Sequence, residues 1–146
     1  MKKETSHQIL RSPDFDEVIW LLESVSLPTA DISPNQMSNF IQLHIGGQLA
    51  GIGGLEMLDG VALLRSLVCV PDYRGLGVGK ALVRELERLA MDKGIKSLYL
   101  LTNTAETFFE KLGYQAVARE DVPEAIKNTR EFTELCPDSA IVMVSA

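Results

Sequence analysis

The sequence has little of what marks a membrane-spanning, disulfide-stabilised or nucleic-acid-binding protein. Its apolar runs are short, as over 140–144, whereas a membrane-spanning helix needs about 20 residues. Its two cysteines, Cys69 and Cys136, form no C-x-x-C pair, so we expect reduced thiols, no disulfide framework and no metal site. Lys and Arg total 14 against 20 Asp and Glu, and no basic run is present. The composition therefore predicts no membrane partner and no nucleic-acid partner.

The remaining composition is typical of one globular domain. The chain has 146 residues, of which 46% are apolar, and about 150 residues make one domain. We therefore expect a single domain over 1–146. Polar residues follow Met1-Lys2-Lys3 where a signal peptide would have its apolar region, so the expected compartment is the cytoplasm.

Hydrophobic periodicity predicts strands and helices in an order that defines the fold. Apolar residues recur at helical spacing over 13–25 and 77–93, and Ser12-Pro13 is a predicted start of the first helix. The other elements that we expect are strands over 8–11, 40–45, 48–58, 61–70, 97–101, 114–119 and 140–144, a helix over 104–112, and a polar excursion over 120–138 that contains a helix over 123–129. This order predicts an α/β (α+β) fold, with a mixed, mostly antiparallel sheet of about six or seven strands and helices on both faces.

The most informative segment joins the apolar strand over 61–70 to the helix over 77–93. Glycines there allow the backbone to approach a ligand with its N–H groups exposed, and the start of a helix favours phosphate. Flanking cations concentrate positive charge in an otherwise acidic chain. The residues concerned are Arg74, Gly75, Gly77, Gly79 and Lys80. Together they predict a pyrophosphate ligand.

Two common phosphate-binding motifs do not fit this segment. A Walker A loop requires Gly in place of Arg74 and Ser or Thr in place of Ala81. A dinucleotide fingerprint requires Gly in place of Lys80 or Leu82. What remains is R-x-x-G-x-G, from Arg74 to Gly79.

The stretch over 68–79, V-C-V-P-D-Y-R-G-L-G-V-G, resembles the acetyl-CoA loop of the GNAT superfamily of N-acetyltransferases. The stretch over 105–114, A-E-T-F-F-E-K-L-G-Y, is similar to the second phrase of that family, A-x-x-F-Y-E-K-x-G-F. The resemblance covers most of the chain and implies the GNAT fold, acetyl-CoA as cofactor and acetyl transfer to an amine. A glycine turn that only caps a helix is the alternative.

The resemblance also implies which residues hold the cofactor. N–H groups over 76–80 would bind the pyrophosphate, and backbone groups of Val68 and Val70 would pair with the pantetheine arm like an added strand. The Val70 N–H would also stabilise the developing oxyanion. The expected cofactor site comprises Val68, Cys69, Val70, Arg74, Gly75, Leu76, Gly77, Val78, Gly79, Lys80, Asn103, Phe108 and Phe109.

Phe109 departs from the family pattern. It stands where many members carry a tyrosine that protonates the leaving thiolate. A thiol with a pKa of about 8.5 is a tolerable leaving group, so transfer can proceed without that tyrosine, but the general acid is unassigned. The same departure motivates a second hypothesis, a catalytically weak sensor that binds acyl-CoA.

Two charged residues on neighbouring strands are candidates for catalysis and substrate binding. If Asp59-Gly60 forms a two-residue hairpin turn, Glu56 lies diagonally opposite Arg65 on one face of the sheet. Glu56 could accept the proton of the amine, and Arg65 could hold a substrate carboxylate in bidentate fashion. A salt bridge between the two on a solvated patch is the alternative.

Three further residues are expected near the substrate: Thr29 after the first helix, Thr102 where the sheet opens, and Arg119 for an anionic group. Asn103 has a second interpretation, because its spacing from Glu106 is that of a capping box.

The acceptor is suggested by phrases that are more specific than the superfamily. The stretches over 27–31, 63–66, 100–106 and 135–140 resemble small arsenic-resistance N-acetyltransferases and the acetyltransferase domain of N-acetylglutamate synthase. This implies a small, amino-acid-like amine as substrate. A polyamine or a protein amine is the alternative, and a homodimer is expected by analogy with the superfamily.

Overall fold

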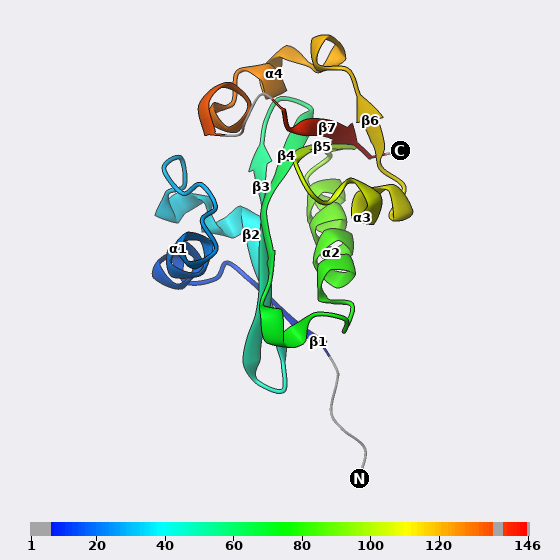
Figure 1. Cartoon of the computed structure of the whole chain (residues 1–146). Coiled ribbons are helices and arrows are strands. Elements are labelled where there is room, and N and C mark those ends of the chain that lie inside the picture. Colours follow the sequence, from blue (N-terminus) through cyan, green and yellow to red (C-terminus); the bar gives the residue numbers. More distant parts are fainter. Residues whose placement is uncertain (1–6, 136–138, 146) are drawn as a thin grey trace.

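A seven-stranded sheet with the order β1-β2-β3-β4-β5-β7-β6 forms the centre of the molecule (Figure 1). The computed structural model describes residues 7–135 and 139–145. Its elements are β1 (His7–Arg11), α1 (Phe15–Ser24), η1 (Pro34–Asn39), β2 (Phe40–Ile45), β3 (Gln48–Met57), β4 (Val61–Cys69), η2 (Pro71–Tyr73), α2 (Val78–Asp92), β5 (Ser97–Thr102), α3 (Glu106–Lys111), β6 (Gln115–Val117), η3 (Arg119–Asp121), α4 (Glu124–Lys127), η4 (Glu131–Leu135) and β7 (Ile141–Val144). The pairings are antiparallel except that of β4 with β5, which confirms the predicted fold class.

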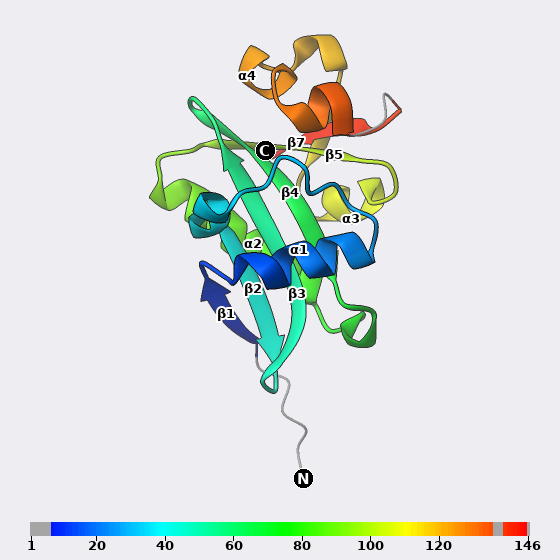
Figure 2. The ribbon, with the colours of Figure 1, turned by 90° about the vertical axis from the view of Figure 1, so that its left-hand side faces the viewer.

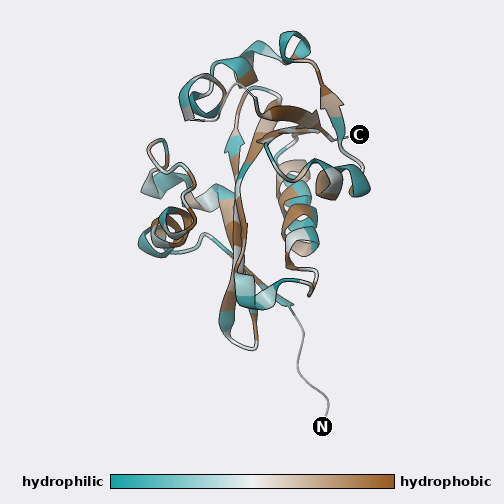
Figure 3. Ribbon diagram, viewed as in Figure 1, coloured by the Kyte–Doolittle hydropathy of each residue, from teal (hydrophilic) through white to brown (hydrophobic). Residues whose placement is uncertain are grey.

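Helices cover both faces of the sheet, as expected. α1 crosses the strands on one face and α2 lies on the other (Figure 2). The predicted apolar stripe of α2 is buried against the sheet, with Val78, Leu82, Leu86 and Leu89 at most 3% exposed. Burying such a side chain stabilises the fold by about 1.5–3 kcal/mol. The central strands are apolar along much of their length (Figure 3), because they are covered on both sides.

Glycines in β3 let the covering layers approach closely. A Cβ atom at Gly54 would lie 2.5 Å from the ring of Phe40, and one at Gly53 would lie 2.9 Å from Leu86. A Cβ at Gly51 would lie 2.8 Å from both Val78 and Leu82 of α2, and 2.7 Å from the carbonyl oxygen of Val68 in the neighbouring strand. A side chain at any of these positions would push a neighbouring layer away from the sheet.

The helix starts differ from the sequence-based expectations. α1 begins at Phe15, and its N-cap is Asp14, whose carboxylate accepts from the Glu17 N–H at 3.0 Å, so the Ser12-Pro13 start is wrong. The Asn103–Glu106 capping box is also wrong, because the N-cap of α3 is Ala105, which makes no side-chain cap.

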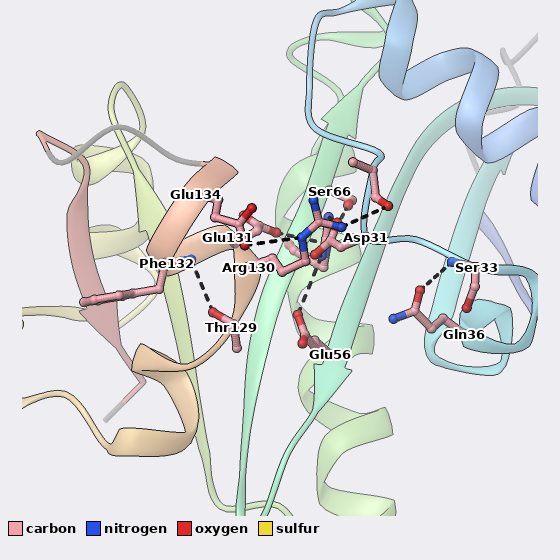
Figure 4. Close-up of polar contacts among 12 residues, drawn as sticks. Asp31, Ser33, Gln36, Glu56, Ser66, Thr129, Arg130, Glu131, Phe132 and Glu134 are labelled. Atoms are coloured by element: carbon pink, nitrogen blue, oxygen red, sulfur yellow. Dashed lines mark hydrogen bonds and ion pairs between the residues drawn. The ribbon is translucent and has the colours of Figure 1, made fainter.

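In its described part, the excursion predicted over 120–138 holds the short helical segments η3, which begins at Arg119, α4 and η4. The helix expected over 123–129 is only the four residues of α4, and the strand expected over 114–119 is only β6. After the excursion, β7 inserts between β5 and β6. η4 is thereby brought to the face of the sheet near β4 (Figure 4). No helix in the described ranges is long and apolar enough to cross a bilayer.

Candidate active site

Strands β4 and β5 diverge and form a fork at the middle of the sheet. Their parallel pairing covers Val61–Ser97, Ala62–Leu98 and Leu63–Tyr99, and beyond this point β5 pairs only with β7. A cavity of about 600 Å³ lies at the fork. Its lining comes from β4, β5, α3, the segments after α1 and β5, and the end of the excursion: Ser26, Leu27, Pro28, Leu64, Arg65, Ser66, Leu67, Leu100, Leu101, Thr102, Asn103, Thr104, Ala105, Phe108, Phe109, Glu131 and Ala140.

A β-bulge lies on the β4 side of this fork. Gly54 pairs with Arg65 but Ile52 pairs with Val68, so two residues of β4 oppose one residue of β3. Ser66, within the bulge, has a φ of 59°, in the left-handed region that few non-glycine residues adopt. Bulges re-aim the groups that follow them along the strand.

The bulge changes which amides of β4 face the open side of the fork. The Val70 N–H donates to the Ala50 carbonyl oxygen at 2.8 Å, toward β3. Because successive N–H groups of a strand point to opposite sides, the Cys69 N–H faces the open side. The expectation that Val70 donates to an oxyanion and that Val68 and Val70 pair with the cofactor arm is therefore wrong. Cys69 has the orientation that those roles require.

The segment after β4 presents exposed amides at the start of α2. Gly77 is the N-cap with a φ of 78°, and no side-chain cap is found in the described part of the chain. The first N–H groups of an α-helix have no intrahelical acceptor, so the turn over 76–80 can donate to a phosphate. Arg74 and Lys80 are exposed beside it, and the space around a Cβ at Gly75 or Gly77 is open. These features fit the diphosphate of coenzyme A.

Phe108 links this turn to the cavity. A Cβ atom at Gly79 would lie 3.0 Å from Cζ of Phe108, so glycine is needed there for the ring to pack. Phe108 also lines the cavity. The turn over 76–80, which we call the phosphate cradle, therefore lies next to the cavity.

Arg65 lies at the centre of a buried ionic cluster on the face of the sheet opposite α2. Its side chain is 2% exposed. Nη1 and Nη2 bind the Asp31 carboxylate in bidentate fashion, the second at 2.8 Å. Nε lies 3.0 Å from Glu131 Oε2, and Nη1 lies 3.6 Å from Glu56 Oε1 (Figure 4). The predicted Glu56–Arg65 contact is confirmed, but its surroundings are buried and not a solvated patch.

The cluster restricts the roles predicted for Arg65 and Glu56. Bidentate binding of a substrate carboxylate by Arg65 would require Asp31 to leave. Glu56 is not among the cavity-lining residues, and its buried Oε1 has no hydrogen-bond partner in the described part of the chain. Burial is the main cause of the raised pKa of Glu56. The Asp31 carboxylate raises this pKa further, and the Arg65 guanidinium offsets part of the rise. Glu56 is thus a proton acceptor that lies near the cavity but does not line it.

Phe109 lies in the core and at the cavity wall. It is 5% exposed and packs edge-on against Phe108 and Tyr114, with ring centroids 5.0 and 5.5 Å away. The Tyr114 hydroxyl is engaged elsewhere, since it donates to Glu87 Oε2 at 2.9 Å. Burial and the Glu87 carboxylate raise the pKa of Tyr114, which makes its phenol a poor acid.

Of the other residues predicted near the substrate, some line the cavity and others do not. Thr102 and Asn103 line the cavity. The Thr102 hydroxyl accepts from the N–H groups of Thr104 and Ala105, at 3.3 and 3.0 Å, so it performs the local bonding expected of Asn103. Thr29 and Arg119 do not line the cavity. Arg119 donates to the Ala140 carbonyl oxygen at 2.8 Å and lies over the Phe132 ring.

Sequence-based reasoning missed Asp31 and Glu131 as partners of Arg65. Asp31 lies in the segment after the first helix, and Glu131 lies in the polar excursion. No local pattern relates these residues to Arg65. Within the described ranges, no group of His, Cys, Asp and Glu side chains could hold a metal ion.

A sequence model described as the acetyltransferase (GNAT) family matches residues 7–114. The chain belongs to the GNAT family. The "Amino-acid acetyltransferase" of Ralstonia nicotianae is 27% identical over 85% of this GNAT chain and 30% of its own length. Protein YyaT of Bacillus subtilis is 34% identical over 72% of the chain and 71% of its own length.

Solved structures share the fold. N-acetylglutamate synthase from Neisseria gonorrhoeae, complexed with coenzyme A and N-acetyl-glutamate, gives a TM-score of 0.79 at 20% identity, over 98% of this chain and 35% of that one. Rv2747 from Mycobacterium tuberculosis, in a complex that contains CoA, gives a TM-score of 0.77 at 19% identity, over 97% and 98%. The chain thus spans about a third of the Ralstonia and Neisseria proteins.

Proposed function

We propose that this GNAT chain is an N-acetyltransferase that uses acetyl-CoA and acetylates the amine of a small, amino-acid-like molecule by direct transfer. The observation that carries the proposal is the fork between β4 and β5, where an open strand edge, a cavity and an uncapped helix start adjoin. The resemblance of this chain to a relative named as an amino-acid acetyltransferase supports the substrate class.

Different residues at the fork bind different parts of the cofactor and of the reacting group. The amides over 76–80 hold the diphosphate, with Arg74 and Lys80 adding positive charge. The Cys69 N–H, on the open edge of β4, is aimed where an oxyanion would develop. Bound acetyl-CoA supplies an acetyl group activated as a thioester. The apolar cavity wall, which includes Leu64, Leu100 and Phe109, keeps bulk water away from the reacting atoms.

No tyrosine hydroxyl lines the cavity in the described part of the chain, so proton transfer relies on other groups. Protons from the amine can pass through water to the cluster of Glu56 and Glu131. The leaving thiolate, with an ordinary thiol pKa of about 8.5, can depart without a dedicated acid.

A thiol-release assay tests the proposal. Acetyl-CoA is supplied with a panel of amino acids, amino-acid amides and polyamines, and we expect release above the acceptor-free rate with amino acids or their amides. Release with polyamines alone would overturn the substrate class. Acetyl-CoA binding measured by calorimetry without release on any acceptor would favour the second candidate, an acyl-CoA sensor, which the missing hydroxyl at Phe109 motivates.

A further inference from the structure

Where Arg65 and Glu131 line the cavity, negative groups outnumber positive ones. Among the described lining residues, only Arg65 and Glu131 carry ionisable side chains. Arg65 is already bound to Asp31 and Glu131, with Glu56 close to Nη1. One positive charge therefore meets at least two negative charges. A further carboxylate from a substrate would enter a region that is already negative.

We propose that Glu131 binds the ammonium group of the acceptor and that Arg65 is a positioning residue which holds Glu131, in place of a clamp for the substrate carboxylate. This rests on the proposed function and names the class of acceptor: a cationic amine that needs no free carboxylate.

The contacts of Glu131 support this role. Glu131 is only 8% exposed, and it lines the cavity. Its charge therefore acts where water is scarce and charge pairs are strong. Oε2 lies 3.0 Å from Arg65 Nε, whose N–H also donates to Ser66 Oγ at 3.1 Å, so the ion pair with Arg65 holds the carboxylate at the cavity. Asp31, bound to the opposite edge of the guanidinium, keeps Nε turned toward Glu131.

The rest of the cavity fits an apolar body on that amine. Leu64 and Leu67 of β4, Leu100 and Leu101 of β5, and Leu27 after α1 all line it. An aliphatic amine can therefore place its charge at Glu131 and its carbon chain against these residues. L-Leucinamide and L-leucine have nearly the same shape and differ in charge, and N-acetyl-L-leucine lacks the ammonium group, so these three compounds are suitable probes.

Calorimetry with L-leucinamide, L-leucine and N-acetyl-L-leucine tests the charge preference, with and without saturating CoA. We expect the cationic amide to bind at least about tenfold more tightly than the anionic N-acetyl form, as one charge-assisted hydrogen bond allows. Tighter binding of leucine or N-acetyl-leucine, or no binding of leucinamide, would overturn the proposal. Because equilibrium binding needs no turnover, failure here is separable from failure of the thiol-release assay.

Variants of one segment assign the preference to Glu131. Glu131→Gln should abolish it, and Glu131→Asp, which keeps the charge, should retain its sign. The matched control is Glu134→Gln, since Glu134 lies in the same segment, is exposed and does not line the cavity. Retention of the preference in folded E131Q, or its loss in E134Q, would contradict the assignment. If the Glu131 variants do not fold, the order of the three probes on the unmodified protein decides.

Discussion

The Val70 N–H donates to the Ala50 carbonyl oxygen at 2.8 Å, and this bond orients the open edge of β4. The hairpin turn begins the β3–β4 ladder with Leu58 N–H bonded to Val61, and Glu56 paired with Leu63. An unbroken ladder in that register would turn Val68 and Val70 toward the open side. The bulge shifts the register by one residue, so Cys69 faces the opening instead.

Alkylation of Cys69 reports whether the cofactor covers this edge. Burial raises the pKa of the half-buried Cys69 thiol, so reaction with iodoacetamide should be slow. We expect desulfo-CoA, which has no thiol, to slow it further. The experiment uses a Cys136→Ser background and mass spectrometry, so that one thiol is measured. An unchanged alkylation rate at saturating desulfo-CoA would contradict the placement of the cofactor along β4.

Substitution at Gly77 tests the phosphate cradle. Gly77→Ala should cost about 1–2 kcal/mol of unfolding free energy, because alanine is strained in the left-handed region, and should also raise the Kd of acetyl-CoA several-fold. Gly60→Ala is the matched control, since Gly60 also has a φ of 78° and open space around its Cβ but lies in the β3–β4 turn. It should lose similar stability with no change in Kd. Equal acetyl-CoA affinity in folded G77A would contradict the cradle.

Removal of Arg65 should destabilise the fold strongly. Arg65→Ala leaves the buried carboxylates of Asp31 and Glu131 without their cation, which typically costs about 3–5 kcal/mol. Arg88→Ala removes an exposed arginine of α2 and should cost at most about 1 kcal/mol. Urea unfolding measures both, and Arg65→Lys should fall between them because it keeps the charge without the bidentate fork. Equal costs for R65A and R88A would show that the cluster is not stabilising.

The pH dependence of stability should report Glu56. Because burial raises its pKa in the folded state, the folded chain binds this proton more tightly than the unfolded chain. The contribution of Glu56 to the unfolding free energy therefore falls as pH rises from the unfolded pKa through the raised folded pKa. Glu56→Gln removes that loss, so the variant should gain stability relative to the parent as the pH rises above the ordinary glutamate pKa of about 4.3. Urea unfolding as a function of pH measures the difference, and an opposite slope would contradict it.

Phe109→Tyr separates the two candidate functions. If thiolate departure needs no dedicated acid, the added hydroxyl should change kcat by less than about 100-fold, the lower limit typical of general acid catalysis. The thiol-release assay measures kcat, and unfolding confirms that the buried hydroxyl is tolerated. A larger rise would show that the unmodified chain lacks its acid and would favour the sensor.

Rules that act over a few neighbouring residues predicted the helices and strands, and also one contact between side chains on different strands. The two-residue turn at Asp59-Gly60 sets the register of the hairpin, and so the Glu56–Arg65 contact could be derived from spacing alone. The stripe of α2 and the glycine-rich turn before it are likewise properties of adjacent residues. Two such phrases carried the resemblance to the GNAT family, and the match over residues 7–114 shows the membership.

The sequence by itself determined the succession of strands and helices along the chain, the covered sheet and the glycine turn that opens α2, since periodicity and turn chemistry act over a few residues. Only the tertiary structure decided which amide faces the fork and which carboxylates surround Arg65. The first depends on a bulge at Ser66 that reverses the alternation of β4, and the second joins Asp31 and Glu131 across chain separations that no local rule spans. Packing, and not spacing, selects such partners.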